Sequence, residues 1–272
     1  MPTVKVGDIN IYYETHGDGE PLLMIQGYGQ YAGHWTTLIP PFSKEYRVIV
    51  FDNRGTGRSD KPEAAYAMKM MAADARGLLD AIGIEAAHIF GVSMGGMIAQ
   101  EFALNYPDRV ISLVLGCTQC GGAKAVPPTP EALAFLFSPE MAKLPVAERA
   151  RQTAPWLWSK EFIDKYPEAV EAYVEITSKY PTPPHGFACQ AQAITGHNTY
   201  DRLPEIKAPT LVIVGSGDRI IQPENSKILA SVIPGAELVM IPNAGHGFTE
   251  SLEATKAILD FLRRHTRGKK KT

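Results

Sequence analysis

The feature that most constrains this fold is the alternation of short, continuously apolar stretches with longer segments of helical periodicity. The stretches 47–51 (RVIVF) and 211–214 (LVIV) are apolar from one residue to the next after Arg47, which is typical of strands buried on both faces of a parallel sheet. Helical character follows in four segments, at 68–82, 94–105, 223–233 and 252–265. Strands that alternate with helices predict βαβ units, and therefore an α/β fold with a mostly parallel sheet.

The first two expected strands form a special case. We expect strands at 9–15, 22–25, 48–51, 88–90, 110–116, 210–214 and 237–241. A short turn sequence, HGDG at 16–19, joins the first two, and such turns commonly connect antiparallel neighbours. We therefore expect these two strands to form an antiparallel meander at one edge of the sheet.

The segment 121–200 breaks this alternation. It contains no convincing strand, and its short helical stretches are interrupted by prolines and rich in aromatic residues. Such a segment suits a helical cap that lies over a pocket. We expect a core domain at 1–120 and 201–272 and a cap, or lid, at 121–200. Most cap aromatics should only hold the cap helices together, but we expect Trp156 and Trp158 to contact a substrate.

The balance of charge bears on the class of partner. The 272 residues include 27 Lys and Arg and 29 Asp and Glu, a formal charge of −2, so no basic surface for nucleic acid is expected. The basic residues at the end of the chain predict a solvated terminus; they are Arg263, Arg264, Arg267 and Lys269–Lys271. No apolar run approaches the ~18 residues of a membrane span, so we expect no membrane partner.

The cysteines and the N-terminal residues predict a cytoplasmic protein. An odd number of cysteines, Cys117, Cys120 and Cys189, in a chain of this size fits a reducing compartment. The opening sequence MPTVKVGDINIYYE does not resemble a secretory signal. Cys117 and Cys120 match C-x-x-C, but the motif ends an expected strand and has no second pair, so we interpret it as a chance spacing of core residues.

The strongest local signal for chemistry is Gly91-Val-Ser93-Met-Gly95, which fits G-x-S-x-G. An expected strand leads into the motif and an expected helix leaves it. At such a sharp turn a serine adopts a strained backbone conformation, so its neighbours must be small, as Gly91 and Gly95 are. The helix start also directs backbone N–H groups at any anion formed nearby. We expect Ser93 to be a nucleophile.

A serine nucleophile needs a base, and the base needs an orienting group. Asp218 follows the expected strand 210–214, and His246 follows the expected strand 237–241. Both side chains should emerge at the carboxyl ends of parallel strands, where α/β sheets place their sites. The stretch directly after the strand 110–116 contains no carboxylate. We therefore expect a catalytic triad of Ser93, Asp218 and His246.

These motifs resemble the α/β-hydrolase superfamily over nearly the whole chain, and especially its cap-bearing carboxylesterase and 3-oxoadipate enol-lactonase branch. The resemblance is carried by the elbow at Ser93, the sequence NAGH ending at His246, and FDNRGTGRS at 51–59. In the family the last of these loops supports the active-site end of the sheet. Asp52 and Ser59 are accordingly expected to be structural.

The same resemblance implies an oxyanion loop at Gln26-Gly27-Tyr28-Gly29. The backbone N–H groups of Tyr28 and Met94 would hold the developing negative charge, and Gly27 would lie against the substrate. Many family members have histidine where this chain has Gln26. Since the donors are backbone groups, this departure leaves the expected oxyanion role unchanged.

The remaining histidines and other motifs indicate no further site. His16, His88, His185, His197 and His265 are expected to be surface or core residues, and His34, although close after the oxyanion loop, is not expected to touch substrate. The sequence contains no H-E-x-x-H zinc motif and no phosphate-binding G-x-G-x-x-G or Walker sequence. We expect no metal and no cofactor.

The nucleophile predicts acyl transfer to water, with a small-molecule ester or lactone as the partner. Activity should decline as the pH falls through about 6.5, the ordinary histidine pKa. Lactonases, C–C bond hydrolases, amidases and perhydrolases that use the same triad remain open. From other classes, a non-enzymatic small-ligand receptor and a purely structural module also remain, and the sequence leaves open a homodimer.

Overall fold

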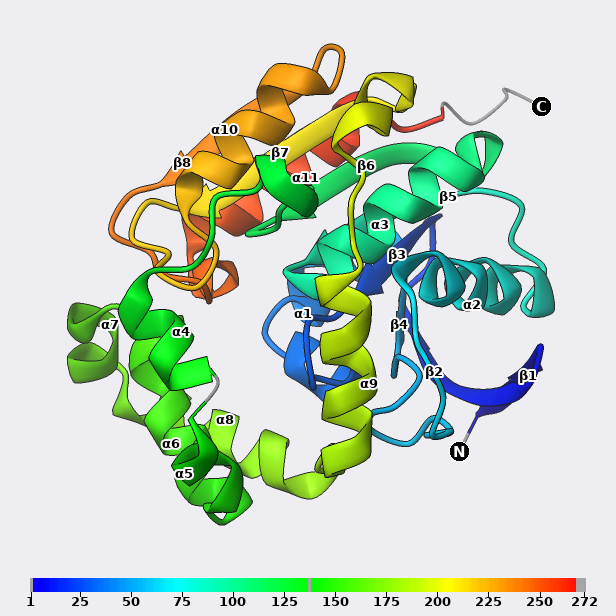
Figure 1. Cartoon of the computed structure of the whole chain (residues 1–272). Coiled ribbons are helices and arrows are strands. Elements are labelled where there is room, and N and C mark those ends of the chain that lie inside the picture. Colours follow the sequence, from blue (N-terminus) through cyan, green and yellow to red (C-terminus); the bar gives the residue numbers. More distant parts are fainter. Residues whose placement is uncertain (1, 137, 268–272) are drawn as a thin grey trace.

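One twisted sheet forms the centre of the molecule (Figure 1). The computed structural model describes residues 2–136 and 138–267, so Lys269–Lys271 of the basic terminus lie outside the described residues. In this part of the chain eight strands form one sheet in the order β1-β2-β4-β3-β5-β6-β7-β8. They are β1 (Thr3–Val6), β2 (Ile9–His16), β3 (Glu20–Ile25), β4 (Tyr46–Phe51), β5 (Ala87–Val92), β6 (Val110–Gly116), β7 (Thr210–Gly215) and β8 (Glu237–Ile241). From β4 to β8 all pairs are parallel, which confirms the expected α/β fold.

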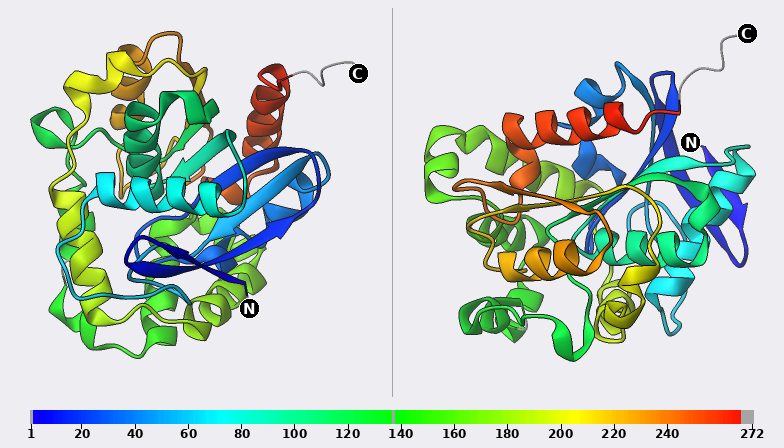
Figure 2. Two further views of the ribbon diagram at one scale, coloured as in Figure 1. Left: turned by 90° about the vertical axis from the view of Figure 1, so that its right-hand side faces the viewer. Right: turned by 90° about the horizontal axis from the view of Figure 1, so that it is seen from above.

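Helices cover both faces of the sheet. The core helices are α1 (Ile39–Phe42), α2 (Met68–Ala81), α3 (Met94–Asn105), α10 (Pro223–Val232) and α11 (Leu252–Arg264). Figure 2 shows α10 and α11 on opposite faces. Successive side chains of a strand point to opposite faces, so Leu23 packs with α2 and α3 while Leu22 packs with α11. Because both faces are covered, every residue of β5 and β7 is buried.

The expected meander of the first two predicted strands is wrong. β4 lies between β2 and β3: it pairs antiparallel with β2 and parallel with β3. The antiparallel hairpin at the sheet edge is instead formed by β1 and β2, which meet at Gly7 with a positive φ of 54°. β1 was not predicted from the sequence, because it has only four residues, three of them at least partly exposed. β2 and β3 follow one another in the sequence, but they are not neighbours in the sheet.

Between β6 and β7 the described residues form helices and no strand of the sheet. They are α4 (Pro130–Leu136), α5 (Pro139–Lys143), α6 (Val146–Leu157), α7 (Lys160–Lys165), α8 (Pro167–Lys179) and α9 (Pro184–Thr195). Several prolines begin these helices, as Pro167 and Pro184 do in α8 and α9, where a fixed φ and a missing N–H are tolerated. Short 3₁₀ turns occur along the described chain, and η3 and η4 belong to the segment between β6 and β7: η1 (Ala32–Trp35), η2 (Pro107–Arg109), η3 (Gly122–Lys124), η4 (Tyr200–Glu205) and η5 (Phe248–Glu250).

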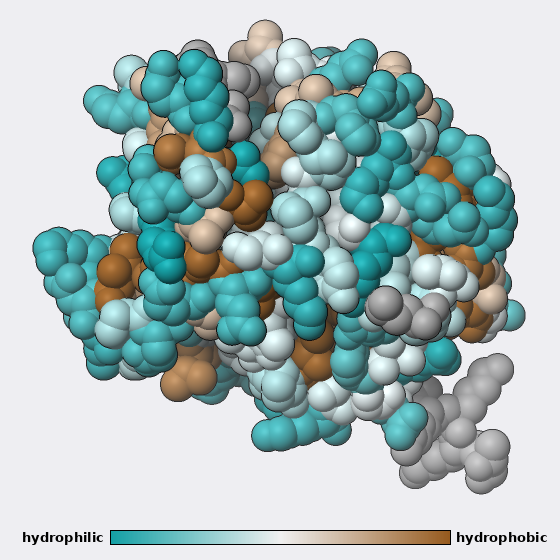
Figure 3. All heavy atoms as spheres, turned by 90° about the horizontal axis from the view of Figure 1, so that it is seen from below, coloured by the Kyte–Doolittle hydropathy of each residue, from teal (hydrophilic) through white to brown (hydrophobic). Residues whose placement is uncertain are grey.

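The helices between β6 and β7 lie over the carboxyl ends of the central strands. In α8, the Ile176 carbonyl accepts a hydrogen bond from the Tyr31 hydroxyl at 2.7 Å. In α9, Gln190 contacts the loops that follow β3 and β4. Seen from below, the molecule has a largely hydrophilic surface interrupted by small apolar groups (Figure 3). Among the described residues, no helix combines the length and apolar character needed to cross a membrane.

Candidate active site

Ser93 occupies a strained turn between a buried strand and a helix. β5 ends at Val92 and α3 begins at Met94, so Ser93 alone makes the turn. Its φ of 54° and ψ of −122° lie in a region that residues with a side chain seldom adopt. The Ser93 N–H donates to the Gly116 carbonyl at 2.9 Å, which ties the turn to β6. The strained conformation expected for Ser93 is therefore present.

The two glycines of the motif are required by close backbone approach. A Cβ on Gly91 would run into the Gly95 carbonyl, and a Cβ on Gly95 would run into the Ile25 carbonyl at the end of β3. The sequence predicted this need for small residues at both positions. The helix start can therefore lie directly against the ends of two strands.

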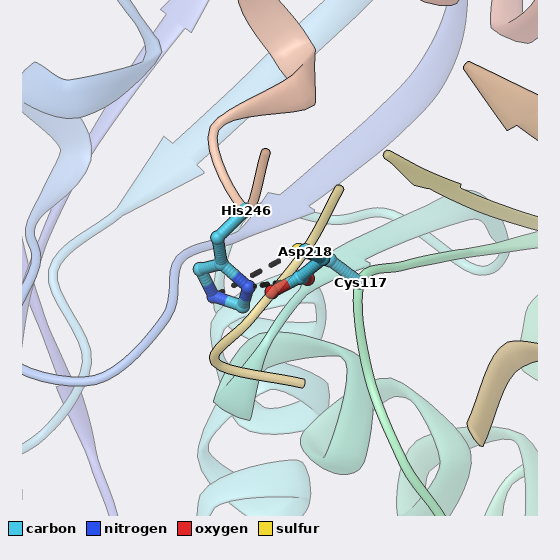
Figure 4. A group of neighbouring side chains, drawn as sticks. All are labelled: Cys117, Asp218 and His246. Carbon is cyan, nitrogen blue, oxygen red and sulfur yellow. Dashed lines mark hydrogen bonds and ion pairs between the residues drawn. The ribbon is translucent and has the colours of Figure 1, made fainter. Parts of the chain in front are cut away.

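Asp218 and His246 meet at the carboxyl ends of β7 and β8. The His246 Nδ1 and the Asp218 Oδ2 are 2.7 Å apart (Figure 4). The other carboxylate oxygen of Asp218 accepts the N–H groups of Ile220 at 2.9 Å and Ile221 at 3.0 Å, and Asp218 is buried. Because the carboxylate is fixed, it holds the imidazole with Nδ1 as donor and leaves Nε2 for other contacts.

The surroundings of His246 change its protonation. Burial by itself lowers the pKa of the imidazole, but the neighbouring Asp218 and Cys117 side chains together raise it by more, so that the pKa stands well above its usual 6.5. The Cys117 thiol also lies beside the ring, with Sγ 4.0 Å from Nε2. These neighbours therefore favour the protonated form of the imidazole.

A single pocket brings the serine and the histidine together. Its lining residues come from the β3 loop, the elbow, the end of β6, the helices α6 and α8, and the β8 loop: Gln26, Gln30, His34, Trp35, Val92, Ser93, Cys117, Leu157, Trp158, Tyr173, His246, Gly247, Thr249 and Glu250. Among the described residues no hydrogen bond joins Ser93 to His246 directly. A wider groove between β1 and α2, beside Asp8 and Arg54, contains none of the predicted site residues.

Comparison with known proteins identifies the family. A family model described as the alpha/beta hydrolase fold matches residues 20–250. The chain belongs to the α/β-hydrolase family. The 2-hydroxy-6-oxo-6-phenylhexa-2,4-dienoate hydrolase of Comamonas testosteroni is 32% identical over 269 residues, which cover 95% of this chain and 93% of that protein. The resemblance inferred from the motifs is thereby confirmed.

Two solved structures show how closely the hydrolase follows its relatives in shape. A thermophilic esterase from Thermogutta terrifontis has a TM-score of 0.84 at 30% identity and is covered over its whole length by 98% of this chain. The enol-lactonase from Burkholderia xenovorans has a TM-score of 0.83 at 25% identity, with 96% of this chain and 100% of that chain covered. The similarity extends over essentially the entire hydrolase.

The loop after β3 lies against the elbow of this hydrolase. A Cβ on Gly27 would stand 3.1 Å from the Ser93 Cβ, so the glycine allows close approach. Gln26, which replaces the usual histidine, accepts the Gly27 N–H with its side-chain oxygen at 3.1 Å. In the described ranges, no hydrogen bond is formed by the backbone N–H groups of Tyr28 and Met94. Both therefore remain available to an acceptor.

The loop 51–59 has the supporting position expected for it. Asp52 is fully buried and accepts the N–H groups of Ala32 at 2.8 Å and Arg58 at 2.7 Å. Ser59 donates to the Asp52 carbonyl at 2.6 Å and accepts the Tyr12 N–H at 2.9 Å. These contacts hold the loop that follows β3 to the sheet, and neither side chain lines the pocket.

The two tryptophans predicted to contact substrate are placed differently. Trp158 lines the pocket, and its indole Nε1 lies so close to Gly247 that a Cβ there would stand 2.6 Å from it. Trp156 is not a lining residue: it stacks on Phe135 with ring centroids 4.9 Å apart, and the Arg219 guanidinium lies over its ring at 4.5 Å. The pocket thus receives Trp158 and not Trp156.

Several polar or aromatic lining residues were not predicted from the sequence. His34, expected not to touch substrate, lines the pocket, as do Cys117, Tyr173 and Glu250. Burial lowers the pKa of His34 to about 4, so its ring is neutral. The position of His34, close after the expected oxyanion loop, could have indicated that it lines the pocket. For Cys117 the signal was its place at the carboxyl end of β6, the edge where Ser93 also lies.

Proposed function

We propose that this chain is a serine hydrolase that cleaves carboxylic esters of small molecules through an acyl-enzyme. One observation carries the proposal: Ser93, held at a positive φ where α3 begins, lines the same pocket as His246, whose imidazole bonds to Asp218 at 2.7 Å. A nucleophile, a base and an orienting carboxylate are the three groups that this chemistry requires.

In the proposed mechanism Ser93 Oγ attacks the ester carbonyl while His246 Nε2 accepts the hydroxyl proton. Asp218 stabilises the imidazolium formed. His246 then gives the proton to the leaving alcohol, and the acyl group remains on Ser93. Water, deprotonated by His246, attacks the acyl-enzyme and releases the acid. These steps require no metal and no cofactor.

We propose that the N–H groups of Tyr28 and Met94 stabilise the tetrahedral intermediate. Two features support this role: the approach of Gly27 to Ser93, and the absence of other acceptors for these two N–H groups among the described residues. Met94 is also the first residue of α3, where the helix dipole favours negative charge. Removing one such donor typically slows the reaction by about 10²–10³-fold.

We also propose that the segment 121–200 acts as a cap on a core made of 1–120 and 201–272. Its helices contribute Leu157, Trp158 and Tyr173 to the pocket that contains Ser93. The core contributes the reacting groups. A pocket closed in this way suits a small molecule and would exclude bulk water from the acyl-enzyme.

The relatives leave a choice between ester, lactone and C–C bond. A lactone is a cyclic ester and would pass through the same steps, and the enol-lactonase shares the fold. By its name, the dienoate hydrolase acts on a carboxylate. The lining residues of this pocket include no Lys or Arg that could pair with such a group. That composition favours an ester or lactone without a carboxylate.

The proposal is tested with Ser93→Ala and a series of short p-nitrophenyl esters. The variant should lose at least about 10³-fold in kcat and should no longer react with a fluorophosphonate label, while its thermal unfolding stays unchanged. Ser231→Ala, at an exposed serine of α10, is the matched control and should behave like the unmodified protein. Full activity of Ser93→Ala would rule out the assignment.

A further inference from the structure

We propose that Glu250 makes the pocket selective by charge, so that it takes esters whose chain ends in a protonated amine and discriminates against esters that end in a carboxylate. This inference rests on the hydrolase function proposed above and specifies the substrate class of the same site.

Glu250 lies in the wall of the pocket close to the reacting groups. It ends η5, four residues after His246, and it lines the same pocket as Ser93. The one hydrogen bond to its carboxylate among the described residues comes from the Thr37 hydroxyl, at 3.4 Å. A carboxylate can accept about four hydrogen bonds. Glu250 therefore presents an acceptor with unfilled positions to whatever occupies the pocket.

No cation of the lining offsets this carboxylate. The lining residues include no Lys or Arg. His34 is neutral, because burial lowers its pKa to about 4. The charge of a protonated His246 is balanced by Asp218, which is 2.7 Å away. Apart from that ion pair, Glu250 is the formal charge of the pocket wall.

One cation stands near the pocket without lining it. The positive charge of Arg149 lowers the pKa values of Tyr28 and Tyr173 against the larger, opposite effect of burial. Its guanidinium packs over the Phe187 ring, 5.4 Å from the centroid. Arg149 is therefore the residue to test if the pocket were to favour a carboxylate after all.

The environment of Glu250 favours a donor from a ligand. Burial raises the pKa of this carboxyl against the opposing hydrogen bond from Thr37, which means that the ionised form is short of solvation. An ammonium group would supply both charge and N–H donors, whereas a second carboxylate would add repulsion. A hydrogen bond to a charged group corresponds to a factor of about 10–100 in binding.

The experiment compares three p-nitrophenyl esters of matched length: the heptanoate, the 6-aminohexanoate and the monoester of heptanedioic acid. In the unmodified protein, kcat/KM for the amino ester should exceed that for the acid ester by about 10–100-fold. Glu250→Gln should reduce this ratio to within about threefold of unity, with each rate taken relative to the heptanoate rate of the same variant. The control Glu253→Gln removes the same charge from an exposed position in α11 and should keep the ratio.

Equal rates for all three esters, or an undiminished ratio in Glu250→Gln, would overturn the proposal. So would a preference for the acid ester, and loss of that preference in Arg149→Gln would identify the responsible cation. Calorimetric titration with hexylammonium and hexanoate repeats the comparison without turnover: tighter binding of hexylammonium that Glu250→Gln abolishes supports the charge selectivity. Hydrolysis of the heptanoate without selectivity removes only this inference, whereas selective binding without any hydrolysis removes only the proposed function.

Discussion

At the scale of single residues, His246 determines the pH range in which the proposed reaction runs. Only the neutral imidazole can accept the Ser93 proton. Although burial lowers the pKa of His246, the neighbouring Asp218 and Cys117 raise it to well above 6.5. We therefore expect kcat/KM to rise with pH through this raised pKa, on the alkaline side of the value near 6.5 that the sequence suggested. Measuring kcat/KM between pH 6 and 10 gives the apparent pKa of this rise, which is the acidic limb of the pH profile.

Asp218→Asn tests the cause of that shift. The amide removes the charge that raises the pKa of His246, so the limb should move to lower pH while the maximal rate falls by about 10⁴-fold, as expected for loss of a triad aspartate. Asp201→Asn, at an exposed aspartate, is the control. A limb that stays in place in Asp218→Asn would contradict the role given to the carboxylate.

The same pair links protonation to folding. Since the pKa of His246 is raised in the folded state, its interaction with Asp218 stabilises the fold fully below the unfolded pKa of about 6.5. This stabilisation is lost as the pH rises through the folded pKa. The pH range that favours the proposed chemistry is thus the range in which this contribution to stability disappears.

Residue identity could be predicted where it depends on local chain geometry. Ser93 and its two glycines follow from the turn itself. The placement of Trp156 and Trp158 depends on where α6 ends: Trp156 lies in the last turn of the helix, whereas Trp158 follows it with an extended backbone (φ −121°, ψ 155°). The sequence did not specify this boundary. Glu250 could not be found from sequence, because only the folded β8 loop brings it to the pocket.

At the scale of elements, the elbow depends on how closely α3 approaches β3. Gly95→Ala would place a Cβ against the Ile25 carbonyl, which belongs to the sheet and cannot move freely. We expect the free energy of unfolding to fall by about 1–3 kcal/mol, the usual cost of overpacking, and esterase activity to fall with the displacement of Ser93. Urea denaturation and ester hydrolysis measure the two effects.

Gly196→Ala provides the matched control for this substitution. Gly196 ends α9 at an ordinary φ of −82°, and a Cβ there would meet its nearest atom at 3.5 Å. The control should therefore leave stability nearly unchanged. If Gly95→Ala were equally mild, close packing of the elbow would not be the reason for that glycine.

Element prediction succeeded where burial and length were sufficient. The strands β3 to β7 and the helices α2, α3, α10 and α11 lie within about two residues of their expected bounds. The order of the strands failed at the sheet edge. There β2 pairs with β4, more than 30 residues away. The sequence of the short turn 16–19 contains no information about a pairing with such a distant strand.

At the scale of the whole molecule, the pocket lies between the strand ends and the helices above them. Four hydrogen bonds to the segment 27–31 join these parts, and one of them runs from the Tyr28 hydroxyl to the Phe187 carbonyl at 3.1 Å. Gly29 donates its N–H to the Gln190 side chain at 2.8 Å, its carbonyl accepts the Thr182 hydroxyl at 2.9 Å, and Tyr31 donates to Ile176 at 2.7 Å. The proposed oxyanion loop and the proposed cap should therefore move as one unit.

Gln190→Met tests this coupling. Gln190 is fully buried in α9, and its side chain satisfies both the Gly29 N–H and, at 3.0 Å, the Arg54 carbonyl. Methionine keeps the length but leaves both groups unpaired, at about 1–3 kcal/mol for each. We expect lower unfolding free energy, faster amide exchange in 27–31, and a larger fall in kcat than in affinity. Gln192→Met, exposed on the same helix, should change none of these, and loss of stability with unaltered kcat would show that the cap and the oxyanion loop are not coupled.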